Sequence, residues 1–171
     1  MDFETEYMRV SLPAEYPYVM LVAGLVAFEV ILMGFFGPGR IRGKIFNQHF
    51  MEQNFGSQIM GDPVLKRDNF DELKSGYPDM GNGTYADKLT YEDWVKFAKA
   101  QRGHLNMLET VTIVVFLVLV TGLEFPMTAC ALGSIYGLFR PLYFMQNRLF
   151  GFVPGVVCLF ALSGTSMYTC Y

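Results

Sequence analysis

The sequence is poor in charge and in cysteine, and it has no excess of basic residues. Only 17% of its 171 residues are charged, whereas soluble domains carry about 25%. The formal net charge of -3 leaves no basic surface for nucleic acid, which is excluded as an expected partner. Cys130, Cys158 and Cys170 all lie in apolar runs, and His49 has no second ligand nearby in the sequence. We therefore predict neither a disulfide framework nor a metal site.

The N-terminal stretch also lacks the basic residues of a cleaved targeting segment. Asp2, Glu4, Glu6 and Glu15 stand against a single Arg9, unlike a secretory signal or an arginine-rich transit peptide. We expect the first membrane segment to act as its own insertion signal.

The chain contains several long apolar runs with few or no charged residues. Hydrophobic residues make up 52% of the chain. A helix crosses the roughly 30 Å hydrocarbon core of a bilayer with about 20 residues. We predict one all-α domain covering residues 1–171, an antiparallel bundle of four transmembrane helices. The expected spans are residues 16–36, 105–123, 125–146 and 149–171.

The connections between these spans differ in length. Short turns near residues 124–126 and 147–148 join the last three spans, so these helices should be antiparallel. A long polar link, residues 37–97, joins the first two. Within it, Thr90-Tyr-Glu-Asp93 resembles a capping box and predicts that the second helix begins near Thr90. An interfacial amphipathic face is suggested by Phe46, Phe50, Phe55 and Ile59.

Basic residues are concentrated in the long link, and Arg9 is the basic residue expected on the opposite side of the membrane. By the positive-inside rule, the link should face the cytoplasm, or the matrix of a mitochondrion. The basic residues of the link are Arg40, Arg42, Lys44, Lys66, Arg67, Lys74, Lys88 and Lys96.

Small residues recur at every fourth position in the last two spans. Ala129, Gly133 and Gly137 form one ladder, and Gly151 and Gly155 form a second pair. Such ladders predict close approach of neighbouring membrane helices.

A polar stripe lies at the mouth of the second span. Arg102, Asn106 and Glu109 are spaced i, i+4 and i+7, which places them on one face of a helix. An arginine fork suits a carboxylate, an asparagine suits a peptide amide and a glutamate suits an ammonium group. Glutathione carries all three groups. An interhelical Arg–Glu pair that only satisfies buried charge explains the stripe equally well.

Other polar residues lie within the apolar runs. Arg140 and Tyr143 provide a second carboxylate clamp and a hydroxyl donor, or Arg140 pairs with Glu109 or Glu29 or reaches the near interface. Glu29 is expected to be a hydrogen-bond partner inside the bundle rather than a proton carrier. His104 lies off the stripe, where it lines the neighbouring face or contacts lipid headgroups.

The stretch Phe97–Glu109, FAKAQRGHLNMLE, resembles the second-helix motif of the MAPEG superfamily, membrane-associated proteins in eicosanoid and glutathione metabolism. It is most similar to the motif of the microsomal glutathione S-transferase type 3 group. Leu12–Val19 resembles that group's approach to the first helix, and Tyr85–Lys88 its approach to the second. Arg140–Tyr143 resembles the third-helix motif R-x-x-Y.

This resemblance implies a four-helix membrane subunit that assembles as a homotrimer, with glutathione bound between subunits as co-substrate. It implies conjugation of glutathione to lipophilic electrophiles, or reduction of lipid hydroperoxides, in an endoplasmic reticulum or mitochondrial membrane. The residues carried over as glutathione-binding are Arg102, His104, Asn106, Glu109, Arg140 and Tyr143.

The chain departs from the family pattern after the third span. Asn147 stands where relatives often have a second tyrosine, and only Arg148 remains near the position of the arginine that stabilises the glutathione thiolate. Arg148 is therefore the candidate catalytic residue. A thiol with a pKa of about 8.5 is mostly protonated near neutral pH unless a cation is close. The alternative is a catalytically impaired accessory or structural subunit of a larger membrane complex, such as a mitochondrial respiratory complex.

Overall fold

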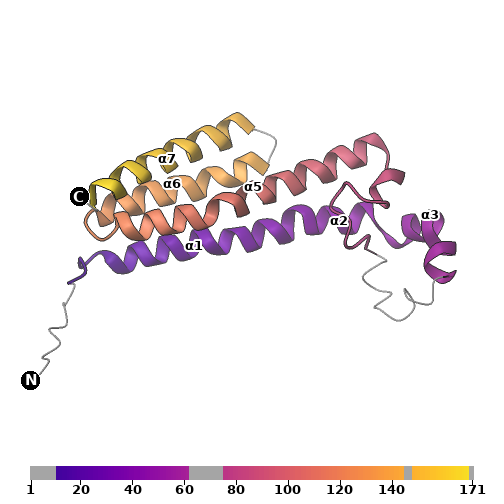
Figure 1. Ribbon diagram of the computed structural model, residues 1–171, viewed down its shortest axis with the longest axis horizontal. Coiled ribbons are helices and arrows are strands. Elements are labelled where there is room, and N and C mark those ends of the chain that lie inside the picture. Colours follow the sequence, from indigo (N-terminus) through magenta and orange to yellow (C-terminus); the bar gives the residue numbers. More distant parts are fainter. Residues whose placement is uncertain (1–10, 62–74, 145–147, 170–171) are drawn as a thin grey trace, which may run out of the picture.

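A computed structural model describes the backbone of residues 11–61, 75–144 and 148–169, and the side chains of these ranges except residues 57–61, 144 and 148. All regular structure in these ranges is helical, which confirms that the fold is all-α (Figure 1). The elements are α1 (Tyr16–Gly34), the π-helical turn η1 (Phe35–Gly39), α2 (Arg40–Ile45), α3 (Gln48–Gly61), the 3₁₀ turn η2 (Ala86–Lys88), α5 (Tyr91–Thr121), α6 (Pro126–Phe144) and α7 (Arg148–Thr169).

Within the described residues, three helical segments are long and apolar enough to cross a membrane, namely Tyr16–Ile45, Tyr91–Thr121 and Leu149–Thr169. The first is longer than predicted because α1 continues through η1 into α2. Pro38 lies inside η1, where the wider π turn accommodates a residue without an N–H donor. The helix α6, which contains Arg140 and Pro141, is not among the three, so the crossing by four helices stays a prediction.

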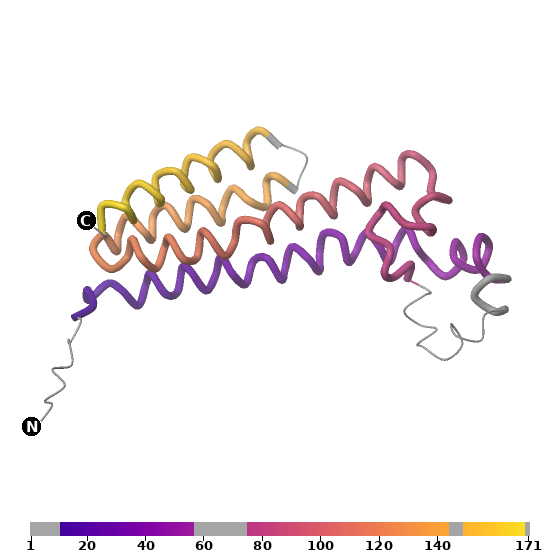
Figure 2. The backbone as a smooth tube through the Cα atoms, viewed as in Figure 1, coloured from indigo at the N-terminus to yellow at the C-terminus, as the bar shows by residue number. Residues whose placement is uncertain are grey.

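The helices α5 and α6 form the centre of the bundle, with α1 packed on one side and α7 on the other (Figure 2). The start of α1 and the end of α7 lie at the same end of the bundle. At the opposite end, the α1–α2 helix and the first turns of α5 project beyond α6 and α7, and the link residues gather around this projection (Figure 1).

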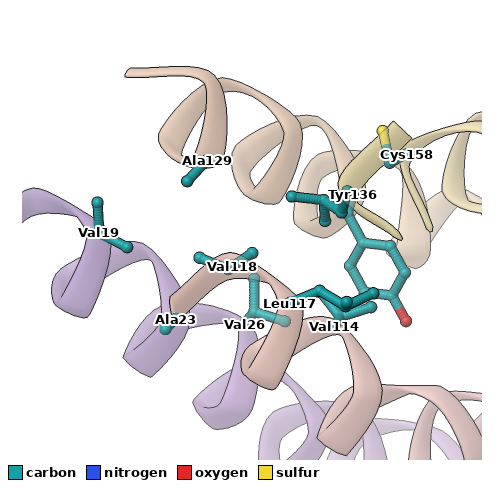
Figure 3. Packing of buried hydrophobic residues seen from close by; sticks show 10 residues of the cluster. Val19, Ala23, Val26, Val114, Leu117, Val118, Ala129, Tyr136 and Cys158 are labelled. Carbon is teal, nitrogen blue, oxygen red and sulfur yellow. The ribbon is translucent and has the colours of Figure 1, made fainter. Parts of the chain in front are cut away.

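Small apolar side chains hold the bundle together. Val19 and Val26 of α1 and Val118 of α5 are buried members of one apolar cluster (Figure 3). A methyl group added at Gly133 of α6 would lie 2.7 Å from Cγ1 of Val22, closer than real side chains approach. The ladder in α6 therefore lets α1 lie directly against it, as predicted. In lipid, such close van der Waals contact drives helix association, since lipid tails are as apolar as the side chains.

The beginning of α5 is fixed by its cap, as the sequence predicts. Thr90 has extended backbone angles, and its hydroxyl accepts the Asp93 N–H at 3.2 Å. Trp94 then donates from Nε1 to the Gly81 carbonyl at 2.8 Å, which ties the link to the first turn of the helix.

The aromatic residues of the link form a second buried cluster rather than an amphipathic face on the lipid. Phe46 and Phe55 are only 1% and 2% exposed. The Phe46 ring lies edge-on to Phe97 of α5 at 5.3 Å, and Phe55 lies edge-on to Tyr85 at 4.9 Å. The interfacial prediction is therefore wrong for these two residues, because the link folds back onto α5. Ile59 has its side chain outside the described residues.

Asp79 organises the part of the link that precedes η2. Its Oδ1 accepts the N–H groups of Gly81 at 2.7 Å and Gly83 at 3.0 Å, and its Oδ2 accepts the Ala86 N–H at 2.8 Å. Burial alone would raise the pKa of the Asp79 carboxyl. Hydrogen bonds from these N–H groups and from that of Tyr85 outweigh burial and hold the pKa below its ordinary value.

Arg42 joins this loop to the helical projection. Its guanidinium donates to the carbonyl oxygens of Gly76, at 2.9 Å, and of Asp79. It also lies over the rings of Phe97, at 5.1 Å from the centroid, and Phe46, at 5.9 Å. The side chain thus links α2, the loop and α5 through both polar and cation–π contacts.

Asp79→Asn should destabilise the loop by about 1–3 kcal/mol, because the ionised acceptor of three buried N–H groups is lost. The native pKa of Asp79 is lower than the reference value of 3.8, so its stabilisation is complete above about pH 5 and declines as the pH falls through the native pKa. Amide hydrogen-exchange protection at Gly81, Gly83 and Ala86 should follow this decline, and the variant should not show it.

The exposed Asp87, in η2, provides a matched control. Asp87→Asn should leave the protection of the three amides and its pH dependence unchanged. Equal loss of protection in the two variants would contradict the role assigned to Asp79.

Candidate functional site

Arg140 lies at the centre of a polar cluster between α5 and α6. Its side chain is 1% exposed. Nη1 donates to Oδ1 of Asn106 at 2.7 Å, and Nη2 donates to the Thr110 hydroxyl at 3.1 Å. The guanidinium lies 4.5 Å from the centroid of the Tyr136 ring, and the Tyr136 and Thr110 hydroxyls are 2.6 Å apart. These contacts fix the position of α6 along α5 at this level.

One nitrogen of the Arg140 side chain, Nε, has no hydrogen-bond partner among the described residues. It is the one such atom among the buried side-chain nitrogen and oxygen atoms of these residues. It lies beside Gly155 of α7, where an added methyl group would be 3.5 Å away. An added methyl group at position 155 would therefore be in ordinary van der Waals contact with the guanidinium.

Arg102 and Glu109 lie on the outer surface of α5. Nη1 of Arg102 is 3.3 Å from Oε1 of Glu109, and the two side chains are 62% and 53% exposed. The pair is within one helix, two turns apart, and not the interhelical pair considered from the sequence. Such an exposed pair contributes about 0–1 kcal/mol to stability. Both groups therefore remain accessible to another molecule.

Asn106 lies between the buried Arg140 cluster and the exposed Arg102–Glu109 pair. Its Oδ1 faces Arg140, so its amide nitrogen points away from Arg140, and it makes no hydrogen bond to any described residue. The predicted stripe is thus divided. Arg102 and Glu109 face outward, whereas Asn106 connects the outer face of α5 to the buried cluster.

His104 lies on a different face of α5 from this stripe. Its imidazole packs against Gly34 of α1, where an added methyl group would lie 2.7 Å from Nε2. The structure therefore places His104 between two helices of one chain, one of the two positions considered from the sequence. It is not brought together with Arg102 and Glu109.

Tyr143 and Arg148 lie where α6 and α7 meet. Tyr143 is half-buried, and its backbone lies so close to Gly151 of α7 that no side chain fits there. The backbone of Arg148 begins α7, but its side chain lies outside the described residues, as does all of Asn147. The proposed catalytic role of Arg148 therefore stays a prediction.

Glu29 of α1 approaches the same cluster from the other side. It is half-buried, and its Oε2 would lie 3.4 Å from a methyl group added at Gly137 of α6. Arg140 attracts this carboxylate, but no nitrogen of Arg140 lies within 4.0 Å of a carboxylate oxygen in the described residues. Asparagine and threonine satisfy Arg140 in place of the acid partners considered from the sequence.

Thr110 and Tyr136 are the functional-cluster residues that the sequence reading missed. Thr110 follows Asn106 by four residues, and Tyr136 precedes Arg140 by four, so each shares a helix face with a predicted residue. That i, i+4 spacing is the signal by which they could have been found.

The described residues contain no group of three or more His, Cys, Asp or Glu side chains arranged to hold a metal ion. Cys130 and Cys158 are unpaired, and Cys158 is buried in the apolar core. Cys170 lies outside the described residues.

Asn106→Ala should lower the free energy of unfolding by about 1–3 kcal/mol, because it leaves a buried donor of Arg140 without its acceptor. Glu109→Gln, which breaks only an exposed pair, should change it by less than about 1 kcal/mol. Denaturant unfolding of the detergent-solubilised protein measures both values. Equal effects would mean that Arg140 gains nothing from Asn106.

Comparison with known proteins identifies the family of the chain. No curated protein matches the chain, and no solved structure does. The sequence model of the MAPEG family matches residues 18–168, a range that contains the link, α5, α6 and nearly all of α1 and α7. The chain is a member of the MAPEG family.

Proposed function

We propose that the protein is a glutathione transferase or glutathione-dependent peroxidase of the membrane, closest to the microsomal type 3 group. The observation that carries this proposal is the outer face of α5. There, the exposed pair Arg102 and Glu109 flanks Asn106, whose amide nitrogen is free of partners among the described residues. A guanidinium, a carboxylate and an amide at these positions match the carboxylate, ammonium and peptide groups of glutathione.

Exposure of these groups in a single chain supports binding between subunits. In the single chain, the side chains of Arg102 and Glu109 are more than half exposed. A second copy of a four-span bundle placed against α5 would close the site, as in a homotrimer. Binding would then replace the weak Arg102–Glu109 pair by charge-assisted bonds to the ligand.

The cluster behind this face supports the site rather than forming its surface. Arg140 is buried and holds Asn106 by its carbonyl oxygen, which leaves the amide nitrogen to donate. In this proposal Arg140 is a positioning residue. His104 packs against Gly34 of α1 on another face of α5 and lies outside this site. Tyr143, in α6, stays a predicted contact of glutathione.

In the transferase reaction, the glutathione thiolate attacks an electrophilic carbon and displaces its leaving group. In the peroxidase reaction, two glutathione molecules reduce a hydroperoxide to an alcohol and water and are joined as a disulfide. Both need the thiolate, which a nearby cation stabilises. Arg148 is the proposed cation.

Arg102→Ala should raise the KM for glutathione by about tenfold or more, because a charge-assisted bond to the ligand is lost. Conjugation of glutathione to a chlorinated aromatic compound by the purified full chain measures this. Glu109→Gln should act in the same direction, whereas Lys88→Gln, in the exposed η2 turn, should leave the KM unchanged. An unchanged KM in both site variants would exclude binding at this face.

Arg148→Ala should lower kcat and move the rising limb of the pH–rate profile to higher pH, because the thiolate loses its cation. Arg148→Lys, which keeps the charge, should restore part of both. A kcat and a pH profile that stay unchanged in Arg148→Ala would assign thiolate activation to another residue.

The folded link favours a second candidate, an accessory subunit of a larger membrane complex. Its aromatic cluster and the Asp79 loop build a structured projection beyond α6 and α7. Mild extraction from membranes distinguishes the two functions. A homotrimer would support the enzyme, and one copy among foreign subunits would support the accessory role.

A further inference from the structure

A cavity of about 520 Å³ lies in the projection, apart from the Arg102–Asn106–Glu109 face. Its walls come from three helices that meet at this end of the molecule, α2, α3 and the first turns of α5. None of the residues considered for glutathione lines it. Its volume falls within the range of about 300–1,000 Å³ that is usual for small-molecule sites.

The polar lining of the cavity has an excess of positive charge. The side chains of Lys44 and His49 make no hydrogen bond or ion pair with any described residue, and both residues are exposed. Lys96 lies 2.8 Å from Glu92 and 3.8 Å from Asp93, so its charge is partly balanced. Asp93 is the acid of the lining, and it also accepts a hydrogen bond from the Thr90 hydroxyl. Lys44 is therefore the lysine of the lining without a counter-charge among the described residues.

The remaining walls combine the polar side chains of Asn47 and Gln53 with three apolar ones. Ile41 and Ile45 contribute from α2, and Phe50 contributes from α3. Phe50 is fixed in place by the rings of Phe46, at 5.9 Å, and Phe55, at 6.2 Å. A ligand that fits both parts of the lining carries an anionic group on a short apolar stem.

The cavity lies near the expected headgroup region of the membrane, where such a ligand could be a lipid. The α1–α2 segment is continuous with a helix that can cross the membrane. Tyr91 and Trp94 stack on each other at 6.0 Å on the exposed surface of α5, one turn from the cavity residue Lys96. Exposed tyrosine and tryptophan side chains of this kind are typical of the headgroup region.

We propose that this cavity binds a phosphoryl group on a short apolar stem, with Lys44 and His49 as its donors. An anionic phospholipid headgroup and a soluble phosphate ester share this chemistry. The stem, whether a glycerol backbone or the first methylene groups of an acyl chain, lies against Ile41 and Phe50. The site is independent of glutathione binding.

Titration of the purified full chain in neutral detergent with dihexanoyl phosphatidic acid tests the proposal, with calorimetry as the readout. Dihexanoyl phosphatidylcholine, which has no net charge, is the reference lipid. The phosphatidic acid should bind at least about tenfold more tightly than the phosphatidylcholine. Lys44→Gln should lower the affinity for the phosphatidic acid by about tenfold. His49→Gln should weaken binding in the same direction.

Lys99→Gln is the matched control, because Lys99 is an exposed lysine of α5 one turn beyond Lys96 and outside the cavity lining. It should bind the phosphatidic acid as the parent does. Glycerol 3-phosphate identifies the source, since equal affinity for it indicates a soluble phosphate ester and much weaker affinity indicates a lipid. The proposal is overturned if phosphatidic acid binds no better than phosphatidylcholine, or if Lys44→Gln and Lys99→Gln have the same affinity.

Discussion

A guanidinium buried in an apolar bundle needs hydrogen-bond acceptors for its donors, and this constraint acts at Arg140. Leaving a charged group unpaired in hydrocarbon costs at least about 2.5 kcal/mol, even on the scale that penalises it least. Asn106 and Thr110 accept two of its hydrogen bonds and the Tyr136 ring lies against the guanidinium, whereas Nε has no partner among the described residues. Because the two acceptors lie on α5 and the donors on α6, these bonds also fix how the two helices lie along each other.

The same constraint determines what α5 presents to the outside. With Oδ1 of Asn106 held by Arg140, the rotation of α5 about its axis is set, and Arg102 and Glu109 must face outward. Their polar surface is therefore a consequence of the buried contact behind it. The cluster beside them, which includes Asn106, holds the backbone that carries Arg102 and Glu109 in place.

The sequence predicts the helical fold well because its signals are local. Thr90 begins α5 as its capping box indicates, and Gly133 allows the close approach of α1 that its ladder indicates. The orientation of the polar stripe could not be predicted in the same way. Arg102, Asn106 and Glu109 lie within about 60° of one another around the helix axis, and the border between buried and exposed surface passes between them. Only the position of Arg140, on another helix, decides where that border falls.

The contacts within the link could not be predicted from the sequence either, and they affect which cation can activate a thiol. Nothing periodic marks Asp79 or Arg42, whose partners are backbone groups that a loop brings together. Arg42 lies in the basic segment α2, which continues the first membrane helix. Its guanidinium is held by two carbonyl groups and two aromatic rings of the folded link. A side chain with these contacts would have to leave all of them to reach the face around Asn106. If this chain activates a thiol there, Arg42 does not supply the cation, because the folded link already holds its guanidinium.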